Sequence, residues 1–124
     1  MNNSLLNLKG TGVAVVTPFK TDLSVDYGSI KKIVNHLIDG GINYLVVQGT
    51  TGESSTLSDY EKDKSREKFL DAVHGRIPVV LGLGGNDTNN LVQKITNSDL
   101  NGFSAILSVT PFYNKPTQEG LFQH

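Results

Sequence analysis

Short apolar runs alternate with longer amphipathic stretches four times along the sequence, and this alternation strongly limits the folds available. The runs are rich in β-branched residues and lack a period of two; they cover residues 12–17, 44–47, 77–81 and 105–109. Such runs predict strands buried on both faces. Strands that alternate with helices predict the α/β class, with a parallel sheet and right-handed crossovers.

The stretches between the apolar runs carry recognisable helix signals. Asp26 precedes apolar residues at helical spacing, and Gly40-Gly41 ends that pattern. Ser58 and Glu61 have the spacing of a capping box. A third helix is predicted over residues 88–98, and a fourth begins near Thr117.

Two α/β architectures begin in this way, the doubly wound sheet and the (β/α)8 TIM barrel. The loops after the second and fourth strands are rich in hydroxyl and aromatic residues, and barrel chemistry lies in such loops. No dinucleotide-binding fingerprint follows the first strand. The sequence therefore predicts a TIM barrel, of which this chain covers about the first four β/α units.

Composition narrows the class of partner. The chain has 124 residues, eleven of them basic and twelve acidic, and a pI near 6.3 without a run of like charge. This balance argues against nucleic acid or a membrane surface and favours a small soluble substrate. The absence of cysteine excludes a thiolate nucleophile and suits a cytoplasmic protein.

The last predicted helix has no stop signal before His124. We therefore expect residues 1–124 to be the truncated N-terminal half of a single TIM-barrel catalytic domain. The first and fourth strands would then have unpaired outer edges, and such edges promote association. We expect the chain alone to be marginally stable or to self-associate.

Thr50 and Thr51 directly follow the second predicted strand, within the segment Gly-Thr-Thr-Gly-Glu at 49–53. Adjacent hydroxyl groups and backbone amides in a glycine-flanked turn suit a small carboxylate. The alternative is an ordinary strand-to-helix loop. Tyr113, just past the fourth strand, could pass a proton to a neighbouring hydroxyl, although aromatic residues at strand ends commonly serve packing.

Other candidate sites have weaker signals. The glycines of residues 82–87 end in Asp87, a carboxylate where a phosphate would require amide donors. The three histidines are scattered, so no metal is indicated, and no cofactor is indicated either. Glu53 is a possible general base, but a carboxylate ahead of a helix more commonly stabilises that helix. No lysine has the apolar surroundings that a Schiff-base nucleophile requires.

Several motifs together resemble the dihydrodipicolinate synthase family. They are Thr-Gly at 11–12, Thr-Pro-Phe at 17–19, Gly-Thr-Thr-Gly-Glu at 49–53, Thr-Leu-Ser at 56–58, Gly-Arg at 75–76, Pro-Val at 78–79, and the stretch at 109–120 that contains Tyr-Asn-Lys-Pro-Thr-Gln-Glu-Gly. The Gly-Thr-Thr-Gly-Glu segment is shared with the wider superfamily that includes N-acetylneuraminate lyase. The stretch around Tyr113 discriminates between the members.

The resemblance implies a homotetrameric barrel enzyme that condenses pyruvate with aspartate semialdehyde through a lysine Schiff base, in lysine biosynthesis by the diaminopimelate route. By motif position, Thr51 binds the pyruvate carboxylate, and Thr50 belongs to a proton relay. Tyr113 is the relay tyrosine lent to the neighbouring subunit's site. The Schiff-base lysine and a second relay tyrosine match positions beyond His124, so we expect the chain alone to be inactive.

Lysine-sensitive family members bind that inhibitor at positions that match Ser55, Asp59, Lys62, Asn86, Asn90 and Phe112. Inhibited members often carry glutamate at the position of Asn90 and tyrosine at that of Phe112. We therefore expect lysine inhibition of the full-length enzyme to be weak or absent. Two alternatives stay open for the chain as a whole: another pyruvate-dependent lyase, acting on a sialic acid or a 2-keto-3-deoxy sugar acid, or an inactive or purely structural fragment.

Overall fold

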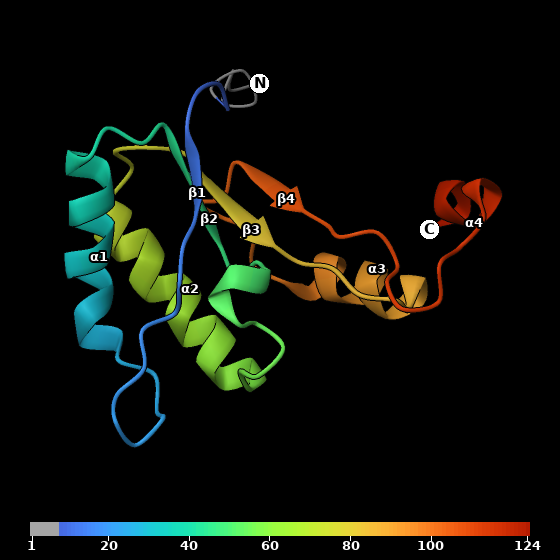
Figure 1. Ribbon diagram of the computed structural model, residues 1–124, viewed down its shortest axis with the longest axis horizontal. Helices are drawn as coiled ribbons and strands as arrows, with labels where there is room; N and C mark the ends of the chain where they lie inside the picture. Colours follow the sequence, from blue (N-terminus) through green and yellow to red (C-terminus); the bar gives the residue numbers. More distant parts are fainter. Residues whose placement is uncertain (1–7) are drawn as a thin grey trace.

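The computed structural model describes residues 8–124, and its strands and helices alternate along the chain (Figure 1). In chain order the elements are β1 (Gly12–Ala14), α1 (Tyr27–Asp39), β2 (Tyr44–Val47), the short 3₁₀ helix η2 (Thr50–Gly52), α2 (Asp59–Val73), β3 (Val79–Gly82), α3 (Thr88–Asn97), β4 (Ala105–Leu107) and α4 (Gln118–Gln123). The prediction of an α/β chain with four strands is confirmed.

The four strands form one parallel sheet in the order β1-β2-β3-β4. Each strand therefore pairs with its neighbours in the chain, as in the register of Val13 with Leu45 and of Leu45 with Val79. A doubly wound sheet reverses its strand order at a switch point, and no such reversal occurs among these strands. Consecutive order is the arrangement that a barrel requires.

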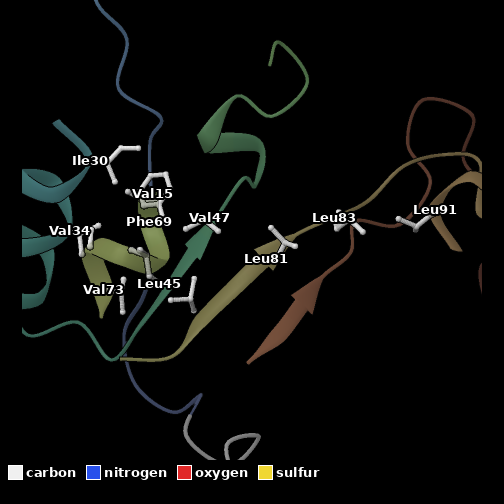
Figure 2. Packing of buried hydrophobic residues seen from close by; sticks show 12 residues of the cluster. Val15, Ile30, Val34, Leu45, Val47, Phe69, Val73, Leu81, Leu83 and Leu91 are labelled. Atoms are coloured by element: carbon white, nitrogen blue, oxygen red, sulfur yellow. The ribbon is translucent and has the colours of Figure 1, made fainter. Parts of the chain in front are cut away.

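The hydrophobic core lies between one face of the sheet and the helices. Alternate strand residues, among them Leu45, Val47 and Leu81, pack in one cluster with Val34 of α1 and Phe69 of α2 (Figure 2). Leu91 of α3 belongs to the same cluster. Because successive strand residues point to opposite faces, the other half of each strand faces away from these helices.

The face away from the helices differs between inner and outer strands. Val46 of β2 and Val80 of β3 are 9% and 6% exposed, whereas Val16, just after β1, and Leu107 of β4 are 50% and 53% exposed. The prediction that every strand is buried on both faces is therefore wrong for the outer two. A strand at the edge of the sheet has a neighbour on one side only, so its second face is less covered.

The helices begin where the capping signals predict. Asp26 accepts hydrogen bonds from the backbone N–H groups of Gly28 and Ser29 at the start of α1. Ser58 and Glu61 form the reciprocal capping box of α2. Thr117 caps α4 through the backbone N–H of Gly120. These bonds satisfy donors that have no partner inside a helix.

Acid should destabilise the chain through two of these caps. Hydrogen bonding from Ser29 lowers the pKa of Asp26, and hydrogen bonding from Ser58 lowers the pKa of Glu61. A carboxyl group whose pKa is lower in the folded state stabilises the fold above its ordinary pKa of about 4. That contribution disappears as the pH falls through the lowered pKa. We expect the urea midpoint of unfolding to fall as the pH drops below about 4.

The variant Asp26→Asn tests this cause, because asparagine still accepts the capping bonds but does not titrate. In this variant the urea midpoint of unfolding should fall less steeply as the pH drops. Asp39→Asn, at the exposed end of α1, is the matched control and should leave the fall in stability at low pH in place. An acid profile that Asp26→Asn leaves unchanged would contradict the assignment.

Candidate active site

The polar residues singled out in the sequence follow the carboxyl ends of parallel strands. Thr17 follows β1, the threonine pair follows β2, and Tyr113 follows β4. The carboxyl ends of parallel strands meet at one edge of the sheet, and this edge carries the reactive groups of barrel enzymes. The loops that contain these residues therefore lie at the same edge of the sheet.

Thr50 and Thr51 form a single turn of 3₁₀ helix at the end of β2. The turn is closed by two backbone hydrogen bonds, from Gly52 N to Gly49 O and from Glu53 N to Thr50 O, each 3.0 Å long. Both threonines are exposed, and within residues 8–124 neither hydroxyl group makes a side-chain hydrogen bond. Two adjacent hydroxyl groups are therefore free to contact a ligand.

This turn is fixed to the segment that follows β1 by a buried hydroxyl group. Thr17, which is 4% exposed, donates from its Oγ1 to the carbonyl oxygen of Gly52 at 2.7 Å. A Cβ atom on Gly52 would lie 3.2 Å from the Val15 carbonyl oxygen, so the two chain segments pass close to each other. Sequence reasoning treated Thr17 only as part of a motif. A threonine at the end of an otherwise apolar run was the available signal for a buried anchor.

Gln48, one residue before the turn, is a second anchor that the sequence did not reveal. It is 3% exposed and has a φ of 56°. Its Nε2 donates to the Lys62 carbonyl oxygen at 2.6 Å, and its Oε1 accepts from Arg66 Nε at 3.0 Å. These bonds tie the end of β2 to α2. A Cβ atom on Gly82 would lie only 2.4 Å from the Gln48 carbonyl oxygen, so this approach requires glycine.

Tyr113 lies in a strained turn after β4. Its φ is 72°, and the N–H of Asn114 donates to the carbonyl oxygen of Phe112 at 3.0 Å. A bond between residues two apart around a positive φ defines a γ-turn of the rare, strained kind. The Tyr113 side chain is 93% exposed. The phenol therefore projects from the chain and does not pack against it.

The chain does not join Tyr113 to the threonine pair. Within the described residues no hydrogen bond connects Tyr113 with Thr50 or Thr51. In Figure 1 the segment between β4 and α4 runs past α3, away from the loop that joins β2 to α2. The threonines and the tyrosine are thus two separate groups on the same edge.

The remaining candidates have structural roles or none. Asp87 accepts a hydrogen bond from the N–H of Asn90 at 3.0 Å and caps α3, so a carboxylate already occupies the place that a phosphate would take. Glu53 ends η2 in the left-handed conformation, and the residue that caps α2 is Ser58. Across residues 8–124, no group of three acidic or histidine side chains could hold a metal ion. No helix in that range is long and apolar enough to cross a membrane.

The family model and the curated relatives that match this chain point to the same family. The family model described as the dihydrodipicolinate synthetase family matches residues 7–124. The 4-hydroxy-tetrahydrodipicolinate synthase of Flavobacterium psychrophilum is 58% identical over 115 residues, which are 93% of this chain and 39% of the relative. That of Cytophaga hutchinsonii is 53% identical over the same shares. The chain thus spans about two fifths of the length of the curated relatives it matches.

The solved structures agree with these relatives. A pyruvate complex of the chloride-inhibited dihydrodipicolinate synthase of Acinetobacter baumannii superimposes with a TM-score of 0.87 at 43% identity, over 94% of this chain and 40% of that one. The structural neighbours are TIM barrels, and the four consecutive strands correspond to the first four β/α units of such a barrel. The barrel prediction is confirmed. The chain belongs to the dihydrodipicolinate synthetase family.

Proposed function

We propose that this chain supplies the first four β/α units of a 4-hydroxy-tetrahydrodipicolinate synthase, which condenses pyruvate with aspartate semialdehyde in lysine biosynthesis. One observation carries the proposal. Among residues 8–124, an anchored turn at the carboxyl edge of the sheet presents two threonine hydroxyl groups that make no side-chain hydrogen bond, in a chain that is 58% identical to an enzyme of that name. The pyruvate complex of the Acinetobacter baumannii relative supports pyruvate as the first substrate.

In this proposal Thr51 binds the pyruvate carboxylate, and Thr50 and Tyr113 pass protons. Hydroxyl groups can hold a carboxylate without a counter-charge when the backbone that carries them is fixed in advance. The bond from Thr17 to Gly52 supplies that rigidity. A chain of hydroxyl groups can move protons during imine formation and cyclisation, because each group stabilises the transient charge on the next.

We propose further that Tyr113 acts in the site of a neighbouring subunit of a homotetramer. Its 93% exposure supports this arrangement, as does the absence of a hydrogen bond between it and Thr50 or Thr51 within residues 8–124. The family's Schiff-base lysine is proposed to come from a part of the barrel that residues 1–124 do not supply. We propose that the enzyme acts in the cytoplasm.

A chimaera tests the proposed reaction. The matched segment of this chain would replace the corresponding 115 residues of the Flavobacterium psychrophilum enzyme. We expect it to turn over pyruvate with aspartate semialdehyde and to be inactive with pyruvate and N-acetylmannosamine. The chain alone, treated with pyruvate and borohydride, should not be labelled covalently. If the chimaera is active with pyruvate and N-acetylmannosamine but not with pyruvate and aspartate semialdehyde, the synthase assignment is contradicted. If the chain alone is labelled, the claim that the nucleophile lies elsewhere is contradicted.

A further inference from the structure

The segment that carries Tyr113 is held by one side chain from the preceding loop. Asn86, between β3 and α3, makes two hydrogen bonds to the backbone of Phe112. Its Oδ1 accepts from the Phe112 N–H at 2.8 Å, and its Nδ2 donates to the Phe112 carbonyl oxygen at 3.0 Å. The carboxamide therefore pairs with both polar groups of one residue, as a neighbouring strand would.

The same carbonyl oxygen also closes the strained turn. Phe112 O accepts from Asn86 Nδ2 and from the N–H of Asn114, and Tyr113, with a φ of 72°, lies between the two bonded residues of that turn. A bulky residue with a positive φ persists only where its surroundings fix it. The pair of bonds from Asn86 fixes the residue immediately before Tyr113.

The two loops are also in close contact at their bases. A Cβ atom on Gly84 would lie 2.8 Å from Val109 Cγ1 and 2.9 Å from Val109 N, so only glycine allows this approach. Leu83 N donates to Leu107 O at 3.0 Å and extends the pairing of β3 with β4. These contacts hold the two loops together at their bases, in addition to the hydrogen bonds from Asn86.

We propose that Asn86 is a positioning residue for the proton relay, because it holds the γ-turn that aims the Tyr113 phenol. This inference rests on the proposed function, in which Tyr113 passes a proton. Asn86 itself touches no substrate in this role. A small displacement of a reacting group can cost about 100-fold in rate, so loss of this support should lower kcat. The KM for pyruvate should change little, because Thr51 lies on a different loop with its own anchor.

The structural part of the proposal is tested by NMR on the isotope-labelled chain. In the unmodified chain we expect slow exchange of the Phe112 N–H and a strong amide-to-Hα NOE within Tyr113, the signature of a positive φ. In Asn86→Ala the Phe112 N–H should exchange like a free loop amide, and the NOE should weaken. The N–H of Leu83 should keep its protection, which shows that the sheet is intact. Unchanged exchange and an unchanged NOE would overturn the proposal.

Kinetics in the chimaera test the catalytic part. Asn86→Ala should lower kcat by about 100-fold with little change in the pyruvate KM. Asn86→Asp retains an acceptor for the Phe112 N–H but sets a charged oxygen against the carbonyl oxygen, so it should also be slow. Asn89→Ala, an exposed residue on α3 whose side chain makes none of the hydrogen bonds described, is the matched control and should retain full activity.

The outcomes separate this proposal from the function on which it rests. If Tyr113→Phe is slow but Asn86→Ala is fully active, the positioning role is overturned while the relay stands. If neither variant is slow, the relay itself is wrong, and the inference built on it fails with it. If both are slow and the NMR changes appear, Asn86 positions Tyr113.

Discussion

Truncating Phe69 to alanine should lower the free energy of unfolding by about 3–5 kcal/mol. Phe69 is 1% exposed and lies on α2 within the cluster that joins the helices to the sheet. Alanine would leave a cavity there, because the surrounding side chains come from several elements and can collapse only in part. Domains of this size are stable by about 5–15 kcal/mol, so the loss is a large fraction of the total.

The measurement is urea unfolding followed by circular dichroism at one fixed protein concentration, since association would otherwise shift the midpoint. Phe122→Ala is the matched control. Phe122 is 82% exposed on α4, so its truncation should change the stability by no more than about 0.5 kcal/mol. Equal losses in the two variants would contradict the packing described for α2.

Replacing Tyr113 by phenylalanine in the chimaera should lower kcat by about 10²- to 10⁴-fold, the range typical for loss of a general acid or base. The variant removes only the phenolic hydroxyl group, so the γ-turn should persist. The pyruvate KM should stay close to the parent value, because carboxylate binding is assigned to Thr51. Steady-state kinetics with both substrates measure the two parameters separately.

Two further measurements sharpen this test. Tyr60→Phe, on an α2 residue that is 70% exposed, is the matched control and should retain activity. Mixing Tyr113→Phe subunits with Thr51→Val subunits should restore activity, because a shared site then receives Thr51 from one subunit and Tyr113 from the other. No restoration in proven mixed oligomers would place the tyrosine in its own subunit's site.

Local signals explain which parts of the fold the sequence predicts well. The caps at Asp26 and Ser58 depend on residues within one helical turn, so they are readable directly from the chain. The strand over residues 44–47 also agrees with its prediction. The first strand is shorter than predicted, Gly12–Ala14 instead of residues 12–17, although Val15 N still donates to Val46 O. Strand length depends on the partner, which a single apolar run does not specify.

In the candidate site, too, some features follow from the sequence and others do not. The placement of Thr50 and Thr51 just after a strand follows from the order of elements, and the structure agrees. The buried anchor at Thr17 and the two bonds from Asn86 join residues distant in sequence. No periodicity or capping rule encodes such contacts. The roles assigned to Thr50, Thr51 and Tyr113 stay predictions, which the kinetic experiments test.

The consecutive strand order has a consequence for how the chain assembles. Each strand finds its partner in the strand made just before it, and no pairing waits for a distant segment. Each pairing still spans a complete crossover, as from Gly12 to Tyr44, and parallel pairing of this kind forms more slowly than local contacts. During synthesis, which proceeds from the N-terminus, each β/α unit can dock on the sheet as it leaves the ribosome. The growing edge of the sheet then serves as the template for the next unit.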